Sequence, residues 1–124
     1  MKKKLNKETI LEMARGFQPS CVIIAAAELD VFTILHARPM NAVQLAARIK
    51  GDLRAVIILL DALVALGFLT KSTDTEPVYR VPKAVAEVLT ADGAQSMLGM
   101  VCHLGNCQRA WGQLASVVLR GKPA

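Results

Sequence analysis

The sequence predicts a mainly α-helical, winged-helix-like domain with one small β-hairpin as its wing. Two helical segments, at about 41–50 and 53–66, are joined by a tight turn at Gly51, which is the order of a helix-turn-helix pair. Two short β-prone runs, 68–71 and 78–81, then flank a polar loop that contains a proline. The length of 124 residues predicts that all of this belongs to one domain.

The first part of the chain predicts two helices. The first begins at Asn6, a residue type that caps helices well, and ends before Gly16. Pro19 begins the second, which runs to about His36. Because this second segment is apolar on most sides, we expect it to lie at the centre of the core.

The next two helices have clear boundary signals. Asn41 begins one of them, and Gln44 stands three residues later, which predicts a capping box. Asp52 caps the following helix, and Gly67 ends it because glycine tolerates a positive φ.

Helices return after the hairpin. One is expected at about 83–89, and another after Asp92, whose side chain would cap together with Gln95. The last helix is expected at about 106–120. Its apolar residues fall on one stripe: Trp111, Leu114, Ala115, Val118 and Leu119.

The helix that follows Asp52 is apolar on two opposite faces. The face expected toward the core carries Leu53, Val56, Leu60, Leu63 and Leu66. The opposite face carries Arg54, Ile57, Ile58, Asp61, Val64 and Ala65. Leaving Ile57 and Ile58 in water would forgo roughly 1.5–3 kcal/mol each relative to full burial. A neighbouring chain is therefore expected to cover this face, where Arg54 and Asp61 either form a salt bridge or stay solvated.

The composition also favours association. The hydrophobic fraction is 53%, where about 45–50% is usual on a similar count. Surplus apolar residues in a small domain tend to end in an interface, so we expect a homodimer. The residues expected at its interface are Val22, Ile23, Ile57, Ile58, Asp61 and Trp111.

The charge pattern does not favour nucleic acid as a partner. The net charge is +5, but three of the fifteen basic residues form the run Lys2–Lys4, which we interpret as a solvated tail. A DNA-reading helix exposes hydrogen-bonding side chains, and the segment after Asp52 exposes isoleucines. A winged-helix transcription regulator that uses Lys71 and Arg80 of the wing remains the alternative. A stand-alone ligand-binding or adaptor protein is a third interpretation.

The residues indicate no catalytic or metal site. On one helix, Cys102 and Cys107 would point about 140° apart, which is poor geometry for a zinc site with His103. No glycine-rich phosphate loop and no nucleophile elbow is present. The odd number of cysteines favours reduced thiols and a cytoplasmic protein. Charges such as Glu28 and Asp30 interrupt the apolar stretches, so no membrane span is expected.

The order of several patterns resembles one family. They are GFQPSCVIIAAAELDVFTIL, NAVQLAARI, LLDALVALGFL, VYRVPKAVAEVL and WGQLASVVLRGKPA. Together, from about Leu11 to Pro123, they resemble the N-terminal domain of SAM-dependent O-methyltransferases of the plant caffeic-acid type and their bacterial small-molecule relatives.

The resemblance implies a winged-helix-like domain that forms an intertwined dimer and covers the substrate site. It implies methyl transfer from SAM to a small hydroxylated molecule by the parent protein, in a catalytic domain that this chain lacks. No cofactor and no catalytic residue is then expected within residues 1–124. The substrate-lining candidates that the resemblance implies are Phe17, Met100, His103 and Leu104.

Overall fold

A computed structural model describes residues 4–124, so Lys2 and Lys3 of the basic run lie outside the described residues. The chain is mainly helical with one small sheet, which confirms that part of the expected fold class. The elements are α1 (Lys7–Ala14), α2 (Phe17–Glu28), α3 (Val31–Ala37), β1 (Met40–Asn41), α4 (Ala42–Ile49), α5 (Leu53–Ala65), β2 (Thr70–Lys71), β3 (Val78–Arg80), α6 (Lys83–Leu89), α7 (Leu98–Trp111) and α8 (Leu114–Arg120).

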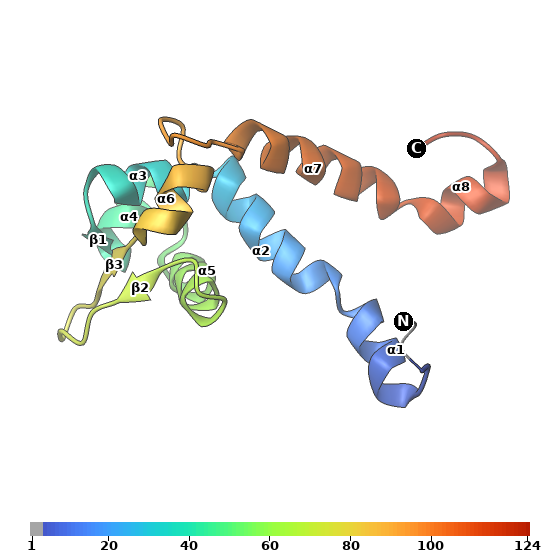
Figure 1. Cartoon of the computed structure of the whole chain (residues 1–124), viewed down its shortest axis with the longest axis horizontal. Coiled ribbons are helices and arrows are strands. Elements are labelled where there is room, and N and C mark those ends of the chain that lie inside the picture. The colour runs from blue at the N-terminus through green and yellow to red at the C-terminus, as the bar shows by residue number, and fades with distance from the viewer. Residues whose placement is uncertain (1–3) are drawn as a thin grey trace.

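The elements form a body and two arms (Figure 1). The body gathers α3 to α6 around the small sheet. The N-terminal arm consists of α1 and α2, and the C-terminal arm consists of α7 and α8. The arms contact each other through α2 and α7, and they diverge toward their tips. The outer helices α1 and α8 therefore lie away from the body.

The core of the body is an apolar cluster beneath α5. Its largest fully buried side chains are Phe32, Leu35, Leu45, Leu60, Leu63 and Val31. Val56, Leu60 and Leu63 of α5 face this cluster, as the sequence predicted. Leu53 and Leu66 were expected there too, but both are exposed, because they lie at the two ends of the helix.

The predicted helix boundaries around α4 and α5 are confirmed. The Gln44 N–H donates to the Asn41 side chain at 2.8 Å, and the Gln44 side chain accepts from the Asn41 N–H at 3.0 Å. The Asp52 carboxylate caps α5 by accepting from the Ala55 N–H at 3.0 Å. At the other end, Gly67 has φ +88° and the next N–H donates to the Leu63 carbonyl at 2.9 Å. This is a Schellman ending, which needs the positive φ.

The hairpin gains a third strand that the sequence did not indicate. β3 lies between β1 and β2 in an antiparallel sheet, with Tyr79 opposite both Met40 and Lys71. β1 is two residues long, too short for a period-2 pattern to appear. The pairing fixes the start of α4 against the hairpin.

The single helix expected from Pro19 to His36 is two helices in the structure. α2 begins at Phe17 and ends at Glu28, and Asp30 takes a left-handed conformation with φ 59° before α3 begins. Aspartate is one of the few residues other than glycine that visits this region. The turn allows α3 to enter the core while α2 projects outward as an arm.

The helix expected after Asp92 begins only at Leu98, and the cap predicted at Asp92 with Gln95 is wrong. The N–H of Gln95 donates to the Glu87 carbonyl at 3.0 Å, and the N–H of Met97 donates to the Val88 carbonyl at 2.7 Å. These bonds supply donors to the open end of α6 and fold residues 90–97 into turns. A Cβ at Gly93 would lie 2.3 Å from the Glu87 carbonyl oxygen, so this close approach needs glycine.

The last expected helix, 106–120, is two helices in the structure. α7 begins earlier, at Leu98, and it is followed at Gly112 and Gln113 by a break before α8. The stripe predicted from Trp111 to Leu119 is therefore divided between the end of α7 and α8.

One helical run, from Lys7 to Glu28, is long and apolar enough to cross a membrane when judged by length and composition alone. The charges at Glu28 and Asp30 were expected to interrupt every such stretch, so this run differs from the prediction. Core helices of other proteins pass the same test, which makes it weak evidence for a span. Here 17% of the apolar window is buried, so most of it faces outward.

The close contact between the arms depends on Gly105. Of the residues described in α7, Gly105 alone is buried. A Cβ built there would lie 2.7 Å from Cγ2 of Ile24 and 3.3 Å from Oε2 of Glu28. The helices can approach this closely because no side chain stands between them.

We expect Gly105→Ala to destabilise the chain by about 1–3 kcal/mol through overpacking, offset by up to about 1 kcal/mol of helix propensity. Gly99→Ala is the matched control in the same helix, because nothing lies within 4 Å of its Cβ position. That control should leave stability unchanged or raise it. Urea unfolding followed by circular dichroism measures both, and equal effects of the two variants would contradict the proposed contact.

Candidate association surface

The arms carry apolar side chains that the chain itself does not cover. Within the described residues, neither α1 nor α8 has a buried residue. The exposed large apolar residues of the arms are Ile10, Leu11, Met13, Phe17, Met100, Leu104, Trp111, Leu114, Val118 and Leu119. Trp111 is 70% exposed and Val118 is 72% exposed. Patches of this extent on a small domain mark an interaction surface.

A cleft of about 500 Å³ lies between α2 and α7. Its lining is Ser20, Ile23, Ile24, Val101, Leu104, Cys107, Gln108 and Trp111. A second hollow of about 340 Å³ shares Cys107 and Trp111 and continues along α8 to Val117. The C-terminal arm therefore presents a long and largely apolar trough.

The cleft brings together residues that were predicted to lie at a dimer interface and a residue that was predicted to contact a substrate. Ile23 and Trp111 were expected at a dimer interface, and Leu104 was expected against a substrate. The other substrate-lining candidates, Phe17, Met100 and His103, are exposed on the arms but are not among the residues that line this cleft.

Polar side chains also connect α2 and α7. Arg109 donates to the Glu28 carboxylate at 3.0 Å and to the Asn106 side-chain oxygen at 2.6 Å. Both partners of the ion pair are partly exposed, so it adds little stability by itself. It joins α2 to α7 across the contact between the arms. No sequence pattern indicates this pair, because its members are 81 positions apart.

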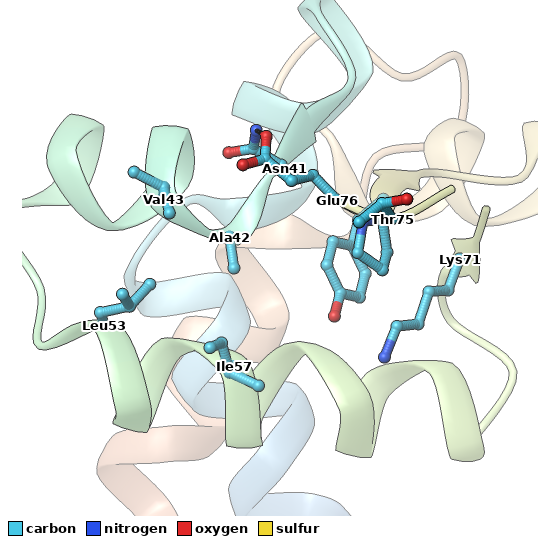
Figure 2. Close-up of a pocket in the computed structure, with 10 residues that line it drawn as sticks. Asn41, Ala42, Val43, Leu53, Ile57, Lys71, Thr75 and Glu76 are labelled. Atoms are coloured by element: carbon cyan, nitrogen blue, oxygen red, sulfur yellow. Dashed lines mark hydrogen bonds between the residues drawn. The ribbon is translucent and has the colours of Figure 1, made fainter. Parts of the chain in front are cut away.

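The remaining expected interface residues lie elsewhere. Val22 is half-buried and packs against the core of the body. Ile58 of α5 is 61% exposed and lies on the helix face opposite the core. Ile57 lines a separate groove between α4, α5 and the hairpin (Figure 2). The six expected residues are therefore divided between the arms and the body.

Asp61 ties α5 to the hairpin within one chain. Its carboxylate accepts from the Tyr79 hydroxyl at 2.7 Å and from the Lys71 ammonium at 2.9 Å. The bond from Lys71, and then that from Tyr79, hold the pKa of Asp61 below its usual value of 3.8. The salt bridge that the sequence suggested between Asp61 and Arg54 is absent from the described residues, where Asp61 pairs with Lys71 instead. Lys71, which the DNA-binding alternative used, is committed to the same carboxylate.

The pKa values of the two donors shift upward. Burial, followed by the bond to Asp61, raises the pKa of Tyr79 above 10.0. The bond to Asp61 is the main cause that raises the pKa of Lys71 above 10.5. The three groups thus stabilise one another in the charge state that neutral pH provides.

Among residues 4–124, no group of three histidine, cysteine or acidic side chains could hold a metal ion. His103 Nε2 lies 3.6 Å from Cys107 Sγ, one turn away on α7. Cys21, Cys102 and Cys107 are free thiols.

The described residues do not fit SAM, the cofactor that the resemblance implies for a catalytic domain. Such sites place a glycine-rich turn between a parallel strand and a helix. The strands described here are two or three residues long and pair antiparallel. We therefore derive no chemistry from SAM at any residue of this chain.

Comparison with known families settles the membership of the chain. A family model described as the O-methyltransferase dimerisation domain matches residues 11–92. The chain belongs to the O-methyltransferase dimerisation domain family. The match confirms the resemblance that the sequence patterns indicated, and family membership implies self-association.

The curated relatives of this dimerisation domain are methyltransferases. It is 31% identical over 115 residues to human acetylserotonin O-methyltransferase, covering 90% of this chain and 33% of the relative. Over 71 residues, it is 39% identical to the tetracenomycin polyketide synthesis 8-O-methyl transferase TcmO of Streptomyces glaucescens, covering 57% of this chain and 20% of that protein. The chain thus spans about a third or less of the length of the curated relatives it matches.

Solved structures show the same fold. The human N-acetylserotonin methyltransferase in complex with SAM matches with a TM-score of 0.80 at 30% identity, over 98% of this chain and 37% of that one. PigF with SAH matches with a TM-score of 0.78 at 28% identity, over 93% of this chain and 33% of that one. The arms are therefore part of the shared fold, because both matches extend over nearly the whole dimerisation domain.

The contact of Asp61 with the hairpin predicts a pH-dependent stability. Because the folded state lowers the pKa of Asp61, its contribution is complete above about pH 3.8 and is lost as the pH falls through the lower, folded value. Since the pKa values of Tyr79 and Lys71 are raised, their contributions are complete below about pH 10 and are lost as the pH rises further.

We expect Asp61→Asn to be less stable than the native chain near neutral pH and to converge with it in acid. The free energy of unfolding, measured in urea from about pH 2 to 7, tests this convergence, which should appear below about pH 3.8. Asp92→Asn, a change at an exposed carboxylate on the 90–97 turn, should run parallel to the native chain. A constant difference between Asp61→Asn and the native chain at all pH values would refute the linkage.

Proposed function

We propose that this chain is the self-associating and substrate-covering part of a SAM-dependent O-methyltransferase that acts on a small hydroxylated molecule. Its family and the methyltransferases that it resembles support this proposal. Because the chain spans about a third of its relatives, the rest of a protein of that length would hold SAM and the catalytic groups. The dimerisation domain itself is then non-catalytic.

The exposed apolar side chains of the arms are the main support for self-association. A winged-helix-like body supports two arms whose apolar faces have no cover in a single chain. We infer that the arms of a second copy lie across them, which gives an intertwined homodimer. Trp111 can bury a large aromatic surface in such an interface, and aromatic residues of this kind dominate interface energetics.

The interface is centred on the cleft between α2 and α7, with Ile23 and Trp111 on its two walls. Ile58 is on the exposed face of α5, and we infer that it lies at the edge of the interface. Ile57 and Asp61 face the hairpin, so their part in the dimer is indirect, through the position of α5.

The substrate-covering role rests on the position of the four candidates. Phe17 begins α2, and Met100, His103 and Leu104 follow one another on α7. All four are exposed on the arms, so crossing arms would place them at the border between two copies. There they would contribute an apolar cover to a substrate bound by the rest of the enzyme.

The free thiols of the three cysteines support a cytoplasmic location.

A glutamate in the centre of the proposed interface should dissociate the dimer. We expect Trp111→Glu to weaken association at least about thirty-fold, the effect of losing a hot spot of 2 kcal/mol. Ile58→Glu should weaken it less, because rim residues contribute less. Sedimentation equilibrium measures each dissociation constant.

Val43→Glu is the matched control, because Val43 is also exposed, at 59%, but lies on α4 of the body. It should leave the dimer intact. A native chain that stays monomeric at about 100 µM, or a Val43→Glu variant that dissociates as readily as Trp111→Glu, would overturn the proposed interface.

Calorimetry tests the non-catalytic role. Titration of SAM into the 124-residue chain should release no heat of binding, because the described residues provide no nucleotide-binding turn. Tight binding of SAM by this chain alone would contradict the proposed division of roles.

A further inference from the structure

A groove on the body has a chemistry that the proposed function does not use. It has a volume of about 240 Å³ and lies between the start of α4, the side of α5 and the hairpin (Figure 2). Its apolar walls are Ala42, Val43, Leu53, Ile57, Pro77 and the ring of Tyr79. No lining residue belongs to either arm, so the groove does not depend on how the arms associate.

Two charged residues line the groove, Lys71 and Glu76. The ammonium of Lys71 lies 2.9 Å from the carboxylate of Asp61, which is not a lining residue, so the charge of Lys71 is balanced from outside the groove. Glu76 lines the groove from the hairpin loop, and its carboxylate accepts from the Asn41 amide at 3.4 Å, beside the start of α4 (Figure 2). Among residues 4–124, no cationic side chain pairs with Glu76. Its carboxylate is therefore the charge available to a ligand.

The size of the groove limits what fits. A cavity of about 150 Å³ with apolar walls holds a benzene molecule. The groove, at about 240 Å³, has room for one six-membered ring or a branched aliphatic group together with a short chain. This is below the range of about 300–1,000 Å³ that is typical of sites for larger ligands.

We propose that this groove binds a small free amine with an aromatic or branched aliphatic body. The body of the ligand lies against Leu53, Ile57 and the Tyr79 ring. Its ammonium group lies at the Glu76 carboxylate, which at neutral pH has the opposite charge. A carboxylate ligand is disfavoured, because it would meet Glu76 and would compete with Asp61 for the one lysine.

The volume favours a small molecule over a basic side chain of another protein. An unbranched lysine chain would leave part of a groove of about 240 Å³ unfilled, and unfilled apolar space forfeits dispersion contacts. A ring fills more of this volume.

Titrations of the 124-residue chain with three matched probes test the proposal. The probes are 2-phenylethylammonium, neutral 2-phenylethanol and anionic 3-phenylpropionate, followed by amide shifts in two-dimensional NMR. We expect the amine to bind most tightly and to shift the signals of Ala42, Leu53, Ile57 and Tyr79. The alcohol should bind more weakly, and the acid should bind most weakly of the three.

Two variants locate the site. Glu76→Gln should weaken binding of the amine about five-fold, the size of an exposed ion pair, and should leave the alcohol unchanged. Ile57→Trp should fill the groove and abolish binding of both, while circular dichroism confirms that the variant is folded. Asp92→Asn, which removes a carboxylate outside the groove, should change neither affinity.

Several results would overturn the proposal. They are equal affinity for the amine and the acid, shifts confined to the arms, binding that survives Ile57→Trp, and an unchanged affinity of Glu76→Gln for the amine. Tighter binding of N-acetyl-lysine amide than of 2-phenylethylammonium would assign the groove to a basic side chain of a partner instead. None of these results depends on whether the chain dimerises, so they are separable from the test of the proposed function.

Discussion

The close approach of α2 and α7 at Gly105 is the constraint on which the shape of the molecule depends. The absence of a side chain at this position lets Ile24 pack against the backbone of α7. The ion pair between Glu28 and Arg109 also joins the two helices. The outer parts of both arms diverge (Figure 1). Their apolar side chains stay exposed in a single chain.

The two apolar surfaces of the molecule differ in scale, and so do the partners that they fit. The arms present a trough that extends over several helical turns and carries little charge, which suits another helix. The groove beside the hairpin is small and is rimmed by Lys71 and Glu76, which suits a compact ligand (Figure 2). The body separates them, because α5 contacts α2 on one side and the hairpin on another.

The sequence predicted the features that depend on local chemistry. The caps at Asn41 and Asp52 and the glycine ending at Gly67 are set by neighbouring residues, and all three are present. The sequence also placed Ile58 on an uncovered face correctly. It could not predict the turn at Asp30, because that conformation is maintained by the packing of α3 into the core. The pairing of Lys71 with Asp61 joins residues ten positions apart in different elements, where helical spacing carries no information.

The turns of residues 90–97 have a mechanical consequence. They satisfy the open carbonyls of α6, and in doing so they fasten the base of α7 to the body through the bond from Met97 to Val88. The base of the C-terminal arm is therefore hydrogen-bonded to the body, and a rotation of the arm at this point would break backbone hydrogen bonds. A force on the arm near Trp111 would be transmitted through α7 to α6 and to the core that α6 packs against.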